Sequence, residues 1–196
     1  DAQRRSDVEG PRLGGVDDQG REVDLDGEAL LLEAELLALC GRSSEAESRL
    51  RGKPELEGRW QERLLGVRYR LDDMAGVVAL YTQNPSLLEQ GVAVQVRVGY
   101  ALGRQGRYGE AMRVYQQALE KPNEDPLERA WLLSAFAALE FEGGELERAV
   151  KHFGQALEKL EGHAGPEAEG RRTVALYNRS QALYRLRRLP EATQDL

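Results

Sequence analysis

The chain of 196 residues is 41% hydrophobic and 31% charged, which is sufficient for one sizeable folded domain or one elongated array. Only 6% of the residues are aromatic, whereas Leu, Ala, Glu and Arg are abundant, and this composition favours helices. The net charge of -7 argues against a general nucleic-acid binder, which normally carries a basic surface. A single cysteine excludes an internal disulfide, and no apolar run reaches the roughly 18 residues of a membrane-spanning helix.

The first 27 residues differ in composition from the rest of the chain. Residues 1–27 are polar and rich in glycine and show no helical period, so we expect an extended or flexible segment. Their acidic residues and a following glutamate fall near the spacing of a calcium-binding loop: Glu22, Asp24, Asp26, Gly27 and Glu33. The match is poor, because Glu stands in place of the usual first Asp and no helix precedes the loop. We instead predict that Asp26 caps the next helix, and we predict no metal and no cofactor.

From residue 28 to residue 196, apolar residues recur at helical spacing in short segments that are joined by turns, which predicts pairs of antiparallel helices. Five such pairs follow one another, at 29–51, 60–82, 92–123, 130–161 and 173–196. The pairs at 92–123 and 130–161 are the clearest. Each has a turn glycine and then a small residue four places before an aromatic residue on the same helix face, as in Ala111 with Tyr115.

The small residue of the second helix provides a marker for each pair. We predict the equivalent markers to be Ala46, Ala75, Ala111, Ala149 and Ala192, with spacings of 29, 36, 38 and 43 residues. The pair at 60–82 lacks a turn glycine, and the residues 161–170 are expected to form a loop. The last pair stops within its second helix, so we expect a further segment, a partner or a second copy to cover this end.

This pattern resembles the tetratricopeptide repeat, most strongly over residues 92–161. The resemblance implies an all-α superhelical solenoid of about four to five antiparallel helix hairpins. In that family the first helices line a concave face where peptides or partner helices bind. The sequence departs from the family pattern at Gln95, where a large aromatic residue is common. Only Arg97 and Asn178 stand at places like those of the chaperone-binding clamp, and their order is wrong for it.

Carrying the family pattern onto the first helices implies a set of partner-binding residues: Arg97, Tyr100, Arg104, Trp131, Phe141, Tyr177, Asn178, Gln181 and Arg185. Trp131 and Phe141 make their helix apolar on two sides, and two explanations stay open. The rings either pack against neighbouring helices or serve as anchors in a groove with a cationic rim. Such a groove would suit a peptide with apolar anchors and some acidic residues.

Residues able to carry chemistry are sparse in this sequence. His152 and His163 have no metal-ligating companion at a useful spacing, and we interpret them as solvated or packed side chains. Cys40 is interpreted as a small buried residue, because no histidine lies in that half of the chain. The segment 171–190 holds six arginines and no acid, and we interpret it as a solvated helix face.

The sequence therefore predicts a protein–protein interaction scaffold without catalysis of its own, without nucleic-acid binding and without direct membrane insertion. Two alternatives stay open. The chain could be the helical arm or sensor region of a larger multidomain regulatory, export or assembly protein. It could also be a self-assembling array that associates through its truncated C-terminal repeat.

Overall fold

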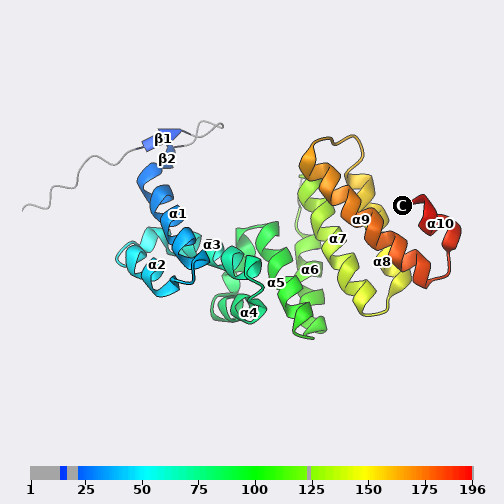
Figure 1. Cartoon of the computed structure of the whole chain (residues 1–196), viewed down its shortest axis with the longest axis horizontal. Coiled ribbons are helices and arrows are strands. Elements are labelled where there is room, and N and C mark those ends of the chain that lie inside the picture. The colour runs from blue at the N-terminus through cyan, green and yellow to red at the C-terminus, as the bar shows by residue number, and fades with distance from the viewer. Residues whose placement is uncertain (1–13, 17–21, 123–124, 196) are drawn as a thin grey trace, which may run out of the picture. The chain divides into compact units, whose positions relative to one another are not determined.

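The computed structural model describes residues 14–16, 22–122 and 125–195, and nearly all of them lie in helices or in the turns between helices (Figure 1). Most of the segment 1–27, predicted to be extended or flexible, lies outside the described residues. The chain divides into two compact units, unit 1 up to Val67 and unit 2 from Arg68 onward. The predicted all-α architecture of antiparallel helix hairpins is confirmed.

Unit 1 begins with two short strands that the sequence analysis did not predict. Strand β1 (Gly14–Val16) pairs antiparallel with β2 (Glu22–Asp24), and both contact the first helix. Helix α1 (Leu25–Leu39) packs against α2 (Ser43–Leu50). Because α1 begins at Leu25, Asp26 lies in the first turn and is not the predicted cap. A 3-10 turn, η1 (Pro54–Leu56), then leads into α3 (Glu57–Arg70), within which the boundary between the units falls.

Unit 2 contains the remaining hairpins. Its elements are α4 (Met74–Gln83), the 3-10 helix η2 (Pro85–Gln90), α5 (Val92–Arg104), α6 (Tyr108–Glu120), α7 (Pro126–Glu142), α8 (Leu146–Lys159), α9 (Pro166–Arg185) and α10 (Leu189–Gln194). Helix α9 begins with a proline inside the segment 161–170 that was predicted to be a loop, and proline is favourable in the first helical turn. The first helices α5, α7 and α9 contact one another in sequence, and each also packs on the second helix of its own hairpin.

The same turn joins the two helices in each of the five hairpins that the structure describes. A residue in the left-handed conformation ends each first helix, and the amide of the next residue donates a hydrogen bond of 2.8–2.9 Å to the carbonyl five residues earlier. This is the Schellman arrangement, which satisfies a carbonyl at the helix end. The left-handed residues are Gly41, Asp72, Gly106, Gly144 and Arg187. Glycine adopts this conformation without steric cost, but Asp72 and Arg187 show that the turn does not require it.

The turn also corrects one predicted marker. The fourth residue of each second helix is almost completely buried, and these residues are Ala46, Val77, Ala111, Ala149 and Ala192. The prediction of Ala75 was wrong, because Ala75 is exposed and Val77 is buried in its place. The predicted register was wrong there because Asp72, and not a glycine, occupies the left-handed position of that turn.

The centre of unit 2 depends on close packing between a glycine and a tyrosine. Tyr115 of α6 lies against Gly99 of α5, and its hydroxyl donates to the Val96 carbonyl at 3.2 Å. Its ring also meets Phe136 of α7 edge-on, with ring centres 6.1 Å apart. Burial raises the pKa of the Tyr115 hydroxyl, so this group stays neutral and can keep its hydrogen bond.

We predict that Gly99→Ala lowers the free energy of unfolding by about 1–3 kcal/mol, the usual cost of overpacking. A Cβ at this position would lie 2.5 Å from the Tyr115 ring, which is held by its own packing and cannot move away freely. The measurement is urea denaturation followed by circular dichroism. The control is Gly109→Ala on α6, where a Cβ would meet no atom within 4 Å and where alanine favours the helix. Equal stabilities for the two variants would contradict the prediction.

Candidate functional site

The nine residues implied by the repeat pattern all lie on the first helices of unit 2. Arg97, Tyr100 and Arg104 belong to α5, Trp131 and Phe141 to α7, and Tyr177, Asn178, Gln181 and Arg185 to α9. Because α5 contacts α7 and α7 contacts α9, these side chains belong to three adjacent helices. We call the surface that they form the first-helix face.

On α5, a tyrosine and an arginine form an exposed polar cluster. The Tyr100 ring meets Tyr69 edge-on, with ring centres 5.5 Å apart. Arg104 donates to the Tyr100 hydroxyl at 2.8 Å, and this bond raises the pKa of the arginine. Burial raises the pKa of Tyr69, an effect that the nearby charge of Arg97 partly opposes. Tyr69 was not among the predicted residues, because it lies at the end of α3, outside the clear repeats.

On α7, both aromatic residues are half-buried beneath arginines of the next first helix. The guanidinium carbon of Arg171 lies 5.0 Å from the centre of the Trp131 ring, and that of Arg185 lies 4.8 Å from the centre of the Phe141 ring. A cation over an aromatic face in this geometry contributes roughly 0.5–2 kcal/mol. Arg185 also donates to the Phe141 carbonyl at 3.5 Å. Trp131 and Phe141 therefore help to pack α7 on α9 while each keeps part of its surface accessible.

Arg171 belongs to this face but was not among the predicted residues. Besides covering Trp131, it donates to the Leu127 carbonyl and, at 2.5 Å, to a carboxylate oxygen of Glu167. It lies 40 residues after Trp131, close to one repeat length, and this spacing is the signal that could have identified the pair.

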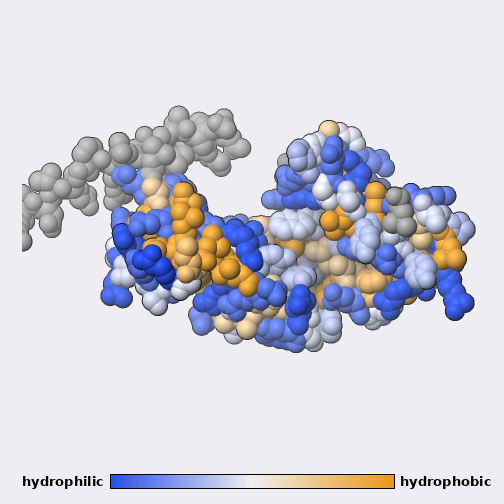
Figure 2. Space-filling model, in the orientation of Figure 1, coloured by the Kyte–Doolittle hydropathy of each residue, from blue (hydrophilic) through white to orange (hydrophobic). Residues whose placement is uncertain are grey.

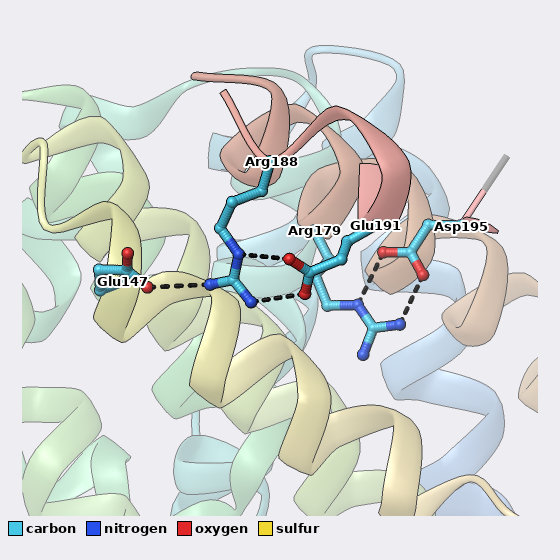
Figure 3. A network of polar contacts seen from close by, with 5 residues as sticks. All are labelled: Glu147, Arg179, Arg188, Glu191 and Asp195. Carbon is cyan, nitrogen blue, oxygen red and sulfur yellow. Dashed lines mark hydrogen bonds and ion pairs between the residues drawn. The ribbon is translucent and has the colours of Figure 1, made fainter. Parts of the chain in front are cut away.

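The remaining arginines of the segment 171–190 also make specific contacts. Figure 3 shows Arg188 between Glu147 of α8 and Glu191 of α10, and Arg179 of α9 facing Asp195. The pair of Arg179 and Asp195 is bidentate, with distances of 2.7 and 2.5 Å, and it raises the pKa of Arg179. Arg172 donates to two carbonyls near the end of α8. The interpretation of this segment as a solvated face was therefore wrong for most of its arginines, which tie the last hairpin together.

The residues predicted on α9 itself remain accessible to different degrees. Tyr177 is 56% exposed and Arg185 is exposed, whereas Asn178 and Gln181 are half-buried. The first-helix face thus presents the Tyr100–Arg104 cluster at α5 and Tyr177 at α9, with the two arginine-covered rings of α7 between these helices.

A buried carboxylate near the end of α7 is a feature that the sequence did not reveal. Glu140 is 1% exposed, although the equivalent turn position is leucine in three other hairpins: Leu37, Leu102 and Leu183. Its Oε2 lies 2.6 Å from Nδ1 of His152. Its Oε1 lies 3.0 Å from Nη2 of Arg148, off the direction of a hydrogen bond. His152 is therefore the partner of a buried acid, and not merely a solvated or packed ring.

The other candidate reactive side chain differs from expectation as well. Cys40 is exposed at the end of α1, so its interpretation as a buried residue was wrong. Within the ranges 14–16, 22–122 and 125–195, no three His, Cys, Asp or Glu side chains are grouped so that they could hold a metal ion. No helix in these ranges combines the length and the apolar character needed to cross a membrane.

Comparison with known proteins relates the fold to a solved structure. No protein-family model and no curated protein sequence matches this chain. The solved structure from "Functional Characterization of Pseudomonas Aeruginosa pilF" aligns with 86% of this chain and 72% of its own, with a TM-score of 0.64 and 16% identity. PilF contains tetratricopeptide repeats. The present fold is tetratricopeptide-repeat-like. At this level of identity, the likeness concerns the fold and not the partner.

We predict that Glu140 can be replaced by leucine more easily than its partners can be removed. Glu140→Leu should leave the free energy of unfolding unchanged or raise it, because a packed apolar side chain often replaces a buried ion pair without loss. Arg148→Ala with His152→Ala should lower it by about 3 kcal/mol, because the buried carboxylate loses both partners. Urea denaturation checks both variants. The triple variant should be more stable than the double variant, and the reverse order would contradict this account.

We also predict that Arg171 shields Trp131 from water. With Trp60→Phe as the background, so that Trp131 is the only tryptophan, Arg171→Ala should shift the emission maximum to longer wavelength and increase quenching by iodide. Unfolding should become easier by roughly 0.5–2 kcal/mol. Arg113→Ala on α6 is the control, since Arg113 is exposed and contacts only its own helix in the described hydrogen bonds. Identical spectra for the two variants would show that Arg171 does not cover the ring.

Proposed function

We propose that this chain is a non-catalytic protein–protein interaction scaffold that binds a peptide or a segment of a partner protein through the first-helix face. The observation that carries the proposal is the repetition of an aromatic residue with an arginine on successive first helices. Tyr100 of α5 is hydrogen-bonded to Arg104, and on the next first helix, α7, Trp131 and Phe141 lie beneath arginines of α9. The likeness to the repeats of PilF supports the scaffold and gives no information on its partner.

The chemistry of the face indicates what kind of segment it would bind. Half-exposed aromatic rings bind apolar side chains with little loss of conformational entropy, because the rings are already held in place. Arg104 and Arg185 lie beside these rings and remain exposed, so they can pair with carboxylates. A segment with apolar anchors and nearby acidic residues therefore fits best. In a larger multidomain protein, this segment could belong to the same polypeptide.

The proposal predicts that binding depends on the Tyr100–Arg104 cluster. Peptides are first selected from a displayed random library for binding to the wild-type chain. Their affinity for the double variant Tyr100→Ala/Arg104→Glu should be at least about tenfold lower, which is a loss of about 1.4 kcal/mol in binding free energy. The contribution of Arg104 should also make wild-type binding weaker at high salt. Fluorescence anisotropy measures both effects, and circular dichroism verifies that the variant is folded.

The matched control is Tyr108→Ala/Arg113→Glu, which makes the same changes on α6, where both residues are also exposed. The affinity of this control for the selected peptides should stay within about twofold of the wild-type affinity. That change is much smaller than the roughly tenfold loss expected for Tyr100→Ala/Arg104→Glu. Equal affinities for both double variants would place the binding surface elsewhere on the chain. Failure to select any acidic, apolar peptide would contradict the proposed ligand chemistry.

A further inference from the structure

The shared turn makes it possible to compare first helices position by position. The left-handed residues that end α5, α7 and α9 are Gly106, Gly144 and Arg187. Three residues before each of them lie equivalent positions: Gly103, Phe141 and Tyr184. On α5, a Cβ added at Gly103 would lie 3.0 Å from Leu139 of α7. On α7, Phe141 is covered by Arg185 of α9. This position therefore faces the following first helix in both of these hairpins.

On α9 the same position is open. Tyr184 is 64% exposed, and no first helix follows α9 within the described residues. A second position behaves in the same way, since Trp131 is half-buried beneath Arg171 whereas its equivalent on α9, Val174, is 55% exposed. These two residues form an apolar surface that we call the successor face: Val174 and Tyr184.

Helix α1 shows the complementary surface. Counting from Gly41, its residues 32, 36 and 39 correspond to Asn178, Ala182 and Arg185 of α9. Arg185 contacts the preceding first helix α7, and Ala182 is fully buried. On α1 the three equivalents are leucines that are 53%, 56% and 36% exposed, and they form what we call the predecessor face: Leu32, Leu36 and Leu39. Figure 2 shows the resulting apolar patch along α1.

The exposed apolar residues are concentrated in the hairpins that contain these two surfaces. Among the described residues, seven of the ten exposed large hydrophobic side chains lie on α1, α9 or α10. Apolar patches of this kind usually mark an interface. Consecutive first helices inside the array contact each other at these same positions. The successor face and the predecessor face can therefore pack together as two consecutive first helices do.

The charges of the two hairpins favour the same pairing. Residues 25–50, which form α1 and α2, carry six acidic and two basic side chains and a net charge of -4. Residues 166–195, which form α9 and α10, carry four acidic and six basic side chains and a net charge of +2. Opposite charges attract the two ends, whereas pairing like ends would bring together charges of one sign.

We propose that a second copy of this chain occupies the successor face, with α1 of one copy taking the place of the next first helix against α9 of another. The contact joins two different surfaces and is therefore heterologous, so each copy keeps one unused surface and can bind a third. This association uses neither Tyr100 nor Arg104, so a substitution at that cluster distinguishes it from ligand binding.

Sedimentation velocity over a range of concentrations tests this proposal on the chain 1–196. The wild type should form dimers and larger species. Leu36→Glu and Tyr184→Glu each place a charge on one of the two surfaces, and each should weaken association at least tenfold. Circular dichroism should show that both variants are folded, because both side chains are exposed. Tyr108→Glu, which changes an exposed tyrosine of α6, should associate as the wild type does.

Mixing the two variants gives the sharper test. The Leu36→Glu copy keeps an intact successor face and the Tyr184→Glu copy keeps an intact predecessor face, so an equimolar mixture should recover dimers but no larger species. A wild-type chain that stays monomeric at all concentrations would overturn the proposal. Association that neither substitution weakens, or a mixture that stays monomeric, would overturn it as well. Normal association of Tyr100→Ala/Arg104→Glu would separate this contact from the proposed ligand site.

Discussion

The architecture depends on one backbone constraint, the left-handed residue that ends each first helix. This residue directs the following amide back to a carbonyl of the helix, and the chain then starts a second helix whose fourth residue is buried. Because every described hairpin uses the same turn, each first helix presents equivalent positions to its neighbours. The regularity of the array thus arises from a local hydrogen bond and not from a constant repeat length, since the buried markers are 31, 34, 38 and 43 residues apart.

Arginine has an unusually large share in the packing of the last two hairpins. Arg171 and Arg185 cover aromatic rings, while Arg179 and Arg188 pair with carboxylates of α8, α10 and the turn after α10. A guanidinium can stack on a ring and donate hydrogen bonds at its edges at the same time, which an ammonium cannot do. The segment with the highest positive charge is therefore largely committed to internal contacts. This commitment is consistent with a protein partner for the chain and leaves little free charge for phosphate.

Two surfaces of different character follow from the same repeat. The first-helix face combines rings and cations that are already held in place, which suits recognition of an extended or helical segment. The surfaces of α1 and α9 are instead the joining positions of the repeat, and they remain apolar where no neighbouring first helix is described. On α9 the two surfaces use different residues, because the first-helix face includes Tyr177 and Arg185 whereas the joining surface consists of Val174 and Tyr184.

The sequence by itself determined the helical hairpins, the clear repeats at 92–123 and 130–161 and the positions of most buried markers, because glycine turns and apolar spacing are local signals. It failed at Ala75, where an aspartate takes the turn position and the register moves by two residues. Only the tertiary structure decided that Trp131 and Phe141 lie beneath arginines and that Glu140 is buried with His152. Those contacts join residues on different helices, and a local sequence pattern does not specify which side chains of different helices will come into contact.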